Sequence, residues 1–293
     1  MRYALLLVAT VASAQPTFKV DTRLVPLLVN VKNAAGDLIG SLDKSEFTVY
    51  DNNVPQEIAV FERYTVQPLS VSILLDISGS TAKELRYETS SIGKFLHALF
   101  VEGNPKDMAA LYSFNYDVNV LSSFTRRQQR LEDSMKFLKP EGGTSLYDAI
   151  CFASRDLQGR EGRHVMVIVS DGGNTTSSKK YKDALDSVLR ADSILFPIVV
   201  IPIVNDAGRN LGGEHALQTL ASSTGGRWFY PNVEQLDHAF ADILRDLRAQ
   251  YMLGYYPRDL PKDTPHFHMV RVELKSKDLR AFTRTGYYGD ETR

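Results

Sequence analysis

The hydrophobic and polar positions of this chain follow two different periods. In both flanks, short apolar runs alternate with polar residues and are separated by turn residues, which is typical of strands. These runs lie at residues 24–31, 47–50, 57–61, 251–256, 269–274 and 281–288. Because neither flank is long enough to bury much surface alone, we predict that residues 18–66 and 251–288 pair into one discontinuous β-sandwich.

The middle of the chain alternates buried strands with amphipathic helices. Apolar runs predict strands at 69–75, 108–114, 118–124, 164–169, 194–203 and 227–230. Apolar residues at helical spacing predict helices at 83–100, 127–138, 146–157, 181–191, 214–222 and 233–249. This alternation predicts an α/β fold with a doubly wound, mostly parallel sheet over residues 68–250, inserted into the β-sandwich. Ligands of such sheets bind at the carboxyl ends of the strands.

The first residues match the pattern of an export signal. A charged start, Met1-Arg2, precedes an apolar run at 3–11 and the small-residue sequence Ala12-Ser13-Ala14. The run is shorter than the roughly 20 residues that span a bilayer, and a buried N-terminal strand or helix is the alternative. We predict a signal peptide at residues 1–14 and an exported mature chain, periplasmic or extracellular, without a membrane span.

Composition excludes several classes of function. Lys and Arg total 34 and Asp and Glu total 35, so the net charge of −1 argues against a nucleic-acid partner. With 43% hydrophobic residues, the chain has enough apolar mass to build a core. The single cysteine, Cys151, excludes an internal disulfide framework and any multi-cysteine metal site.

A carboxylate and two hydroxyls follow the first strand of the α/β region. The sequence Asp76-Ile77-Ser78-Gly79-Ser80 places three oxygen ligands on one short loop. Oxygen-only ligands suit a hard cation, Mg²⁺ before Ca²⁺ or Mn²⁺. Alone, the same residues fit a strand-ending turn in which Ser80 or Thr81 caps the next helix.

Two later loops favour the metal hypothesis over that turn. Gly142-Gly143-Thr144-Ser145 precedes a predicted helix and offers the Thr144 hydroxyl. Asp171 follows the buried run at 164–169. In a doubly wound sheet these loops share one edge with Asp76, so the sequence predicts one metal site from three loops.

This set of residues resembles the metal-ion-dependent adhesion site of von Willebrand factor type A domains. The five matching ligand positions are Asp76, Ser78, Ser80, Thr144 and Asp171. Further likeness lies in Gly142-Gly143-Thr144, Leu146-Tyr147-Asp148-Ala149 and Thr224-Gly225-Gly226. The flanks resemble a bacterial subgroup described from acidobacteria, at Phe47-Thr48-Val49-Tyr50-Asp51, Gln56-Glu57-Ile58, 251–257 and Gly286-Tyr287-Tyr288.

The resemblance implies a mechanism of recognition. It implies that Ser78 and Ser80 bind the ion directly, and that Thr144 and the two aspartates bind directly or through water. Few direct carboxylates leave a cation under-neutralised and attractive to an outside acid. We therefore predict a protein-binding, adhesion-type module whose partner presents Asp or Glu. In related domains the last helix moves with the metal loops, so a shift of residues 233–249 would reach the strand at Tyr251.

Two other classes of function stay open. An enzyme is not expected, because Asp76-Ile77-Ser78-Gly79 is not the aspartic-protease D-[ST]-G, and the chain has neither a phosphate loop nor a nucleophile elbow. A Mg²⁺-dependent hydrolase is the enzymatic alternative. Cys151 lies in a predicted helix and is expected to pack, and His266 and His268 are expected in a solvated loop. The other alternative is an assembly scaffold with a structural metal, whose tyrosines lie on the surface or in the core of the β-sandwich: Tyr255, Tyr256, Tyr287 and Tyr288.

Overall fold

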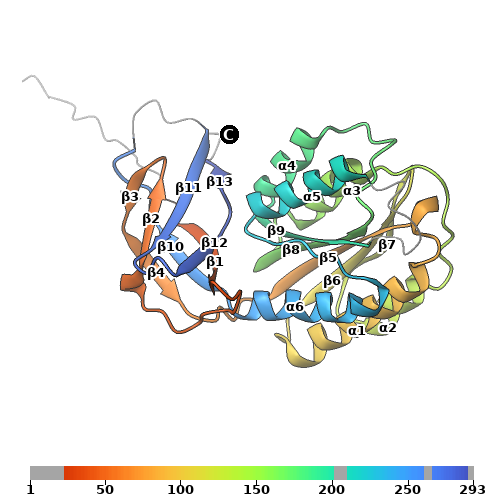
Figure 1. The fold of residues 1–293 in the computed structure, drawn as a ribbon, viewed down its shortest axis with the longest axis horizontal. Helices are drawn as coiled ribbons and strands as arrows, with labels where there is room; N and C mark the ends of the chain where they lie inside the picture. The colour runs from red at the N-terminus through yellow and green to blue at the C-terminus, as the bar shows by residue number, and fades with distance from the viewer. Residues whose placement is uncertain (1–22, 201–209, 261–265, 290–293) are drawn as a thin grey trace, which may run out of the picture.

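The computed structural model describes residues 23–200, 210–260 and 266–289. Figure 1 shows two parts side by side, a β-sandwich formed by both ends of the chain and an α/β domain formed by its middle. The predicted signal peptide at 1–14, the start of the sandwich at residue 18 and the end of the run at 194–203 lie wholly or partly outside the described residues. They stay predictions. In the ranges that the structure covers, no helix has the length and apolar content needed to cross a bilayer.

The α/β domain is built on a five-stranded sheet in the order β7-β6-β5-β8-β9. Four strands are parallel: β5 (Leu69–Asp76), β6 (Met108–Phe114), β8 (Arg163–Ser170) and β9 (Ser193–Val199). The edge strand β7 (Val118–Thr125) runs antiparallel to β6. Every residue of β5, β8 and β9 is buried, as expected for strands covered on both faces. The predicted mostly parallel sheet is confirmed.

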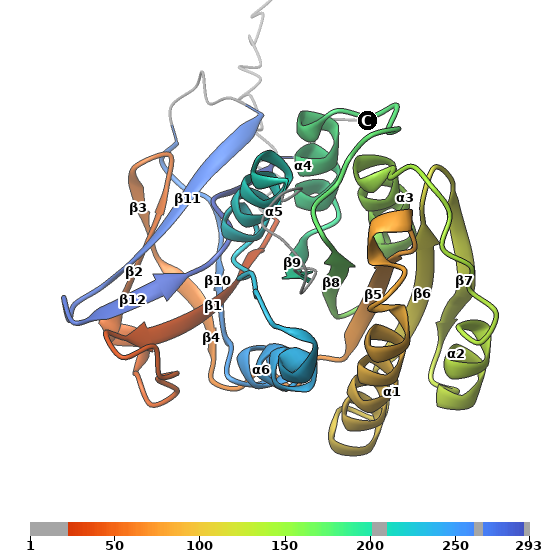
Figure 2. The ribbon, with the colours of Figure 1, turned by 45° about the vertical axis from the view of Figure 1, so that its right-hand side comes forward.

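Helices cover both faces of this sheet, as Figure 2 shows. One face packs against α1 (Leu85–Glu102), α2 (Gln128–Ser134) and α6 (Leu236–Arg248). The other packs against α3 (Leu146–Leu157), α4 (Tyr181–Arg190) and α5 (Leu211–Ser223). Short 3-10 helices span Lys44–Glu46, Gly79–Thr81 and Val233–Gln235. Two clusters of buried apolar side chains, one on each face, therefore hold the sheet in place.

The β-sandwich consists of two four-stranded sheets, and each contains strands from both flanks. The first has the order β12-β1-β10-β4, with β1 (Val25–Asn33), β4 (Ile58–Glu62), β10 (Tyr251–Tyr255) and β12 (Leu279–Phe282). The second has the order β13-β11-β2-β3, with β2 (Phe47–Asp51), β3 (Val54–Gln56), β11 (Phe267–Leu274) and β13 (Gly286–Tyr288). One shared cluster of buried apolar residues lies between them.

The α/β domain is inserted between two neighbouring strands. β4 and β10 are antiparallel partners, with Met252 opposite Glu62, and the whole domain lies between them in the sequence. β10 also pairs with β1 along its other edge. The chain therefore leaves and re-enters the sandwich at adjacent positions of one sheet.

Asp51 links the two sheets of the sandwich through a buried polar network. Its fully buried carboxylate accepts hydrogen bonds from Tyr255 at 2.9 Å and Tyr287 at 2.7 Å, and His268 Nδ1 lies 2.9 Å from it. Tyr255 is completely buried, whereas Tyr256 is 37% exposed. Tyr255 therefore lies in the core of the β-sandwich, whereas the sequence alone allowed either a core or a surface position for this tyrosine.

Three local expectations from the sequence are wrong. The run at 281–288 forms two strands in different sheets, because the chain crosses from β12 to β13 at Thr283–Thr285. Residues 227–230 form only an isolated bridge from Phe229 to Ile198. His268 does not lie in a loop but in β11, where the buried Asp51 holds its ring.

Candidate metal centre

Three loops meet at the carboxyl edge of the parallel sheet. They follow β5 (residues 76–81), precede α3 (142–145) and follow β8 (171–177), and we call them the candidate metal loops. Figure 2 shows α1 starting from the carboxyl end of β5. Backbone bonds tie the loops to each other and to the end of β6: Glu141 donates to Ile77 at 3.0 Å and Ser145 to Asn115 at 2.6 Å. The topology therefore creates the edge at which such folds bind ligands.

Asp76 is the most firmly held side chain of the candidate metal loops. It is completely buried, and its Oδ1 accepts from the Ser78 amide at 2.9 Å. Its Oδ2 accepts from the Ser170 hydroxyl, the last residue of β8, at 2.6 Å. Burial raises the pKa of Asp76 to about 6, while the hydrogen bonds from Ser170 and Ser78 oppose that rise. The carboxylate is thus oriented by hydrogen bonds to both of its oxygens.

Ser78 and Ser80 lie together on the first loop. Their hydroxyl oxygens are 3.1 Å apart, and Ser78 is buried while Ser80 is exposed. The Thr81 hydroxyl donates to the carbonyls of Asp76 at 2.9 Å and Ser78 at 3.1 Å. Because Thr81 closes its own loop and α1 starts later, at Leu85, the helix-capping alternative does not describe this turn.

Thr144 and Asp171 face the same small space from the other two loops. A Cβ placed on Gly173 would lie 3.0 Å from Asp171 Oδ1 and 3.4 Å from Thr144 Oγ1. The Gly173 amide donates to that aspartate oxygen at 2.8 Å. The Thr144 amide donates to the Thr175 hydroxyl at 2.9 Å, and the Thr144 carbonyl accepts from the Thr175 amide at 2.8 Å. Glycine at 173 leaves room for both oxygens.

The predicted ligands of the first loop are linked to those of the other two loops through Ser170. Asp76, Ser78 and Ser80 form one hydrogen-bonded group, whereas Thr144 and Asp171 both lie close to Gly173. Ser170, next to Asp171 in the chain, bonds to Asp76, and the charge of Asp171 contributes to the raised pKa of Asp76. All five predicted ligand positions therefore lie on the candidate metal loops, at one edge of the sheet.

The donor set fits a hard cation and no softer metal. Every predicted ligand atom is a hydroxyl or carboxylate oxygen, which suits Mg²⁺, Ca²⁺ or Mn²⁺. Among the described residues, no three His, Cys, Asp or Glu side chains gather closely enough to hold an ion. An ion here would therefore depend on hydroxyl ligands beside its two aspartates.

Two acidic residues near these loops escaped the sequence analysis. Glu88 on α1 is completely buried, and neither of its carboxylate oxygens has a hydrogen-bond partner. Glu84, one turn earlier, is 6% exposed and also has an unpartnered oxygen. Burial, followed by the charges of Asp76, Glu84 and Asp171, raises the pKa of Glu88 well above its usual value. The available signal was the position of Glu88, four and seven residues before Ile92 and Phe95 on the apolar face of α1.

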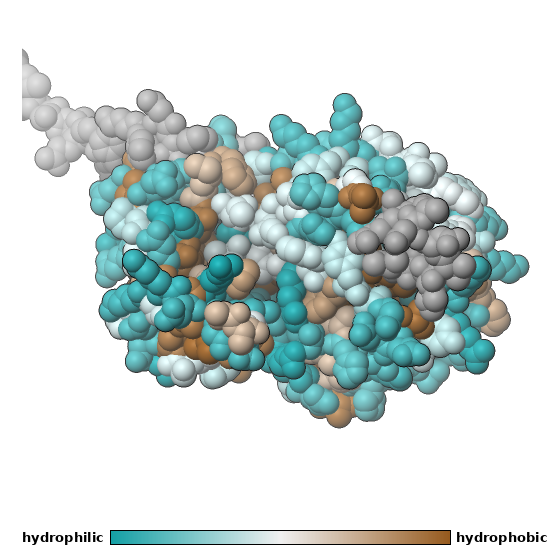
Figure 3. Space-filling model, viewed as in Figure 1, coloured by the Kyte–Doolittle hydropathy of each residue, from teal (hydrophilic) through white to brown (hydrophobic). Residues whose placement is uncertain are grey.

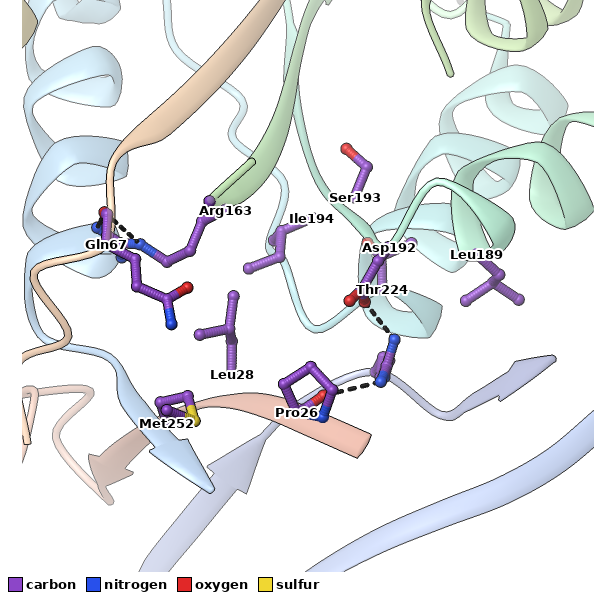
Figure 4. Close-up of a pocket in the computed structure, with 12 residues that line it drawn as sticks. Pro26, Leu28, Gln67, Arg163, Leu189, Asp192, Ser193, Ile194, Thr224 and Met252 are labelled. Atoms are coloured by element: carbon purple, nitrogen blue, oxygen red, sulfur yellow. Dashed lines mark hydrogen bonds and ion pairs between the residues drawn. The ribbon is translucent and has the colours of Figure 1, made fainter. Parts of the chain in front are cut away.

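A small cavity between the two domains lies at the opposite edge of the sheet. Its volume is about 60 Å³, room for a few water molecules. Figure 4 shows the residues of both domains that line it. Arg163 donates to the Gln67 carbonyl at 3.2 Å, and Arg284 donates to the Pro26 carbonyl at 2.8 Å. Because Arg163 is the first residue of β8, this cavity lies at the amino ends of the strands and belongs to the domain joint.

The comparisons with known proteins define the class of this fold. Residues 71–174 match the family model of the von Willebrand factor type A domain, a range that includes all five predicted ligands. The α/β domain therefore resembles a von Willebrand factor type A domain, and the two sheets of the β-sandwich lie outside the matched range. No curated protein matches the chain. The closer resemblance of the flanks to the acidobacterial subgroup stays a prediction.

Several solved structures resemble the α/β domain. The conserved hypothetical protein BatB from Bacteroides thetaiotaomicron is 17% identical, with 60% of this chain and 99% of that chain covered and a TM-score of 0.46. The vWF domain of the type V pili tip protein Mfa5 from Porphyromonas gingivalis is 13% identical, with coverage of 62% and 95% and a TM-score of 0.48. The PilB minor pilin from Streptococcus sanguinis is 12% identical, with coverage of 63% and 62% and a TM-score of 0.48.

Proposed function

We propose that this protein is an exported binding module that recognises an acidic group of a protein partner through a divalent cation. One observation carries the proposal. Five oxygen-bearing side chains, of which only two are carboxylates, lie on three loops at the carboxyl edge of the sheet. Similar folds occur in a pilus tip protein and in a minor pilin, and a role in adhesion is proposed by comparison with them.

The residues of the candidate metal loops have separate roles in this proposal. Ser78 and Ser80 would hold the cation through their hydroxyls, while Thr144, Asp76 and Asp171 would hold it directly or through water. When bound, Mg²⁺ (or Ca²⁺ or Mn²⁺) supplies a positive centre with a coordination position open to an outside carboxylate. The hydrogen bonds from Ser170 to Asp76 and from Gly173 to Asp171 orient both aspartates.

An exposed aromatic side chain at the edge of these loops supports partner recognition. Tyr116 is 52% exposed, and its Cβ would lie 3.0 Å from a Cβ on Gly143. Its carbonyl accepts a 2.9 Å hydrogen bond from the Ser145 hydroxyl, which fixes the backbone. Tyrosine is common among the residues that dominate binding energy at interfaces. We therefore assign Tyr116 to the surface that contacts the partner.

Metal binding is the first test of the proposal. Isothermal titration of the full chain with Mg²⁺, Ca²⁺ and Mn²⁺ is expected to give one site, absent from Asp76→Ala and Asp171→Ala. The matched control is Asp133→Ala, an exposed carboxylate on α2 away from the candidate metal loops. Absence of binding to the wild type, or equal binding to Asp171→Ala, would refute the proposal.

Partner capture is the second test, and it separates recognition from an assembly scaffold. Capture that is lost with chelator and with Asp171→Ala supports metal-bridged recognition. Undiminished capture supports the scaffold, in which the ion is structural and the β-sandwich binds. That second candidate rests on exposed apolar side chains of the sandwich, such as Met269 at 59% and Phe282 at 41% exposure. Figure 3 shows hydrophobic side chains gathered on this part of the molecule.

Two further parts of the proposal need their own measurements. A non-enzymatic role predicts no Mg²⁺-dependent turnover of phosphate or ester substrates, and such turnover lost in Asp76→Ala would favour the hydrolase instead. Export predicts an N-terminus at Gln15 in protein recovered from the periplasm or medium, as read by N-terminal sequencing. Retention of residues 1–14 would contradict the signal peptide.

A further inference from the structure

A buried carboxylate lies on the helix that follows the first candidate metal loop. The Glu88 side chain has no exposure to solvent and neither oxygen is hydrogen bonded. On the same face of α1, Ile92 and Phe95 are buried in the apolar core. An ionised carboxylate without donors is strongly disfavoured in such surroundings. An ionised Glu88 therefore needs a nearby group that compensates its negative charge.

The described surroundings of Glu88 supply no such group. The charges that act on it come from Asp76, Glu84 and Asp171, and all three are acidic. No Lys, Arg or His of the described residues forms an ion pair or hydrogen bond with it. The charges that act on Glu88 are therefore all negative, and the part of the chain that the structure describes places no Lys, Arg or His in contact with its carboxylate.

A short series of bonds connects Glu88 to the candidate metal loop. The Thr81 hydroxyl donates to the Asp76 carbonyl at 2.9 Å, and the Glu84 amide donates to the Thr81 carbonyl at 3.1 Å. The Glu88 amide then donates to the Glu84 carbonyl at 3.1 Å. The position of Glu88 is thus fixed relative to Asp76 by the backbone, and not by a flexible connection.

We infer that Glu88 is a positioning residue of the metal centre, where it would supply negative charge beyond that of the two aspartates to a cation held there. This inference rests on the proposed function, because it needs a cation at Asp76 and Asp171. A direct bond from Glu88 is not part of it, since no three carboxylates of the described chain lie close enough to share an ion. The cation then becomes part of the folded domain and stabilises it.

The test compares Glu88→Gln with the wild type in the full chain, using Mg²⁺ alone as the probe. Outer partners of a metal site typically contribute about 10–100-fold to affinity, so we expect Glu88→Gln to raise the Kd for Mg²⁺ at least about tenfold. In chelator, Glu88→Gln is expected to melt at or above the wild-type temperature, because a buried carboxyl group without hydrogen-bond partners is removed. Mg²⁺ is expected to raise the Tm of the variant less than that of the wild type.

Two control variants distinguish this role from simple packing. Glu88→Asp keeps the charge and is expected to retain a Mg²⁺ affinity between those of the wild type and Glu88→Gln. Ser91→Ala removes a buried hydroxyl on the same helix, 2.7 Å from Asp237, and is expected to lower Tm without changing the Kd. Glu88→Asp also keeps the test valid should Glu88→Gln fail to fold.

The outcomes separate this inference from the proposed function. Equal Mg²⁺ affinity of the wild type and Glu88→Gln overturns the role of Glu88 and leaves the metal-binding proposal standing. The same is true if Glu88→Gln lowers Tm equally in Mg²⁺ and in chelator. A wild type that binds no Mg²⁺ overturns both.

Discussion

Asp246 on α6 is the main polar contact between the last helix and the β-sandwich. Its nearly buried carboxylate accepts from Arg227 Nε at 2.6 Å and from Lys32 Nζ, on β1, at 3.3 Å. Its backbone carbonyl accepts from the Asn30 amide group at 2.7 Å. Burial lowers the pKa of Lys32, and the charge of Asp246 opposes this, so the ammonium depends on its partner. The Asp246→Ala substitution removes that partner.

The expected loss of stability follows from the burial of the two cations. Removing one partner of a buried ion pair costs about 3–5 kcal/mol. The Lys32 side chain is 14% exposed, whereas Arg227 is 34% exposed and keeps Asp242 at 3.2 Å. Only Lys32 is left largely buried and unpaired, so we take the lower end, about 3 kcal/mol. At about 2–4 °C per kcal/mol for a large domain, Tm should fall by roughly 6–12 °C.

Thermal unfolding followed by circular dichroism measures this loss. Asp242→Ala is the matched control on the same helix, because its carboxylate is 32% exposed and exposed pairs contribute less than about 1 kcal/mol. The double variant Lys32→Met with Asp246→Ala should be more stable than the sum of the single effects predicts. The reasoning is refuted if Asp246→Ala shifts Tm no more than Asp242→Ala, or if the double variant shows no coupling.

The contact of Asp246 with β1 also predicts how a conformational change would pass from the α/β domain to the β-sandwich. We expect Mg²⁺ to change the hydrogen-exchange protection of residues 233–251 in the wild type and not in Ser78→Ala. Asp246→Ala should keep the change in α6 and β10, because the Ala249–Gln250 connection remains, and should lose it in β1, because the ion pair between Lys32 and Asp246 is gone. Unchanged protection of 233–251 in wild type that demonstrably binds Mg²⁺ would contradict coupling.

Three further predictions concern the partner surface, the sandwich and the core. Tyr116→Ala should weaken partner binding about tenfold in surface plasmon resonance while the Mg²⁺ Kd stays constant; unchanged binding would remove Tyr116 from the interface. Asp51→Ala should reduce the free energy of unfolding in urea by about 3 kcal/mol or more, because three donors lose their acceptor. A loss no greater than that of Tyr255→Phe would contradict the network. Cys151 is buried and burial raises the pKa of its thiol, so at pH 8 a thiol reagent should modify native protein more than about tenfold slower than unfolded protein. Equal rates would show that the helix does not protect it.

The sequence predicted the α/β domain well because its signals are local. The runs at 69–75, 108–114 and 164–169 are mostly apolar without the strict polar alternation of a half-exposed strand, as expected for strands covered on both faces. Asp76 directly follows the first of these runs and Asp171 lies two residues after the last, so parallel pairing alone brings them to one edge. The candidate metal loops could therefore be located without any knowledge of side-chain contacts.

Other features could not be predicted because their signals depend on distant partners. The sequence predicted that the two flanks pair, but not that β1 pairs with β10 with Val25 opposite Tyr255, because neither strand carries a feature that specifies its partner. Residues 281–288 have strand propensity throughout, so the crossing between sheets was hidden. Glu88 was missed for a related reason, since one acidic residue in a helix usually indicates its solvated face. Only the structure, in which this face of α1 is buried, shows that Glu88 lies in the interior.

The way the two parts are joined limits how a change at the candidate metal loops can spread. Only Ala249 and Gln250 separate α6 from β10, and Gln250 is 1% exposed. The Gln250 side chain accepts from Arg163 at 3.0 Å, at the start of β8, and donates to Asn30 on β1 at 3.2 Å. A connection bonded to both domains cannot absorb a displacement of α6 as a free hinge would. A movement of α6 must therefore displace β10 or break these bonds, and β10 lies between β1 and β4 in the middle of its sheet. The insertion geometry thus makes the sandwich the expected recipient of any rearrangement that a bound partner causes at the opposite edge.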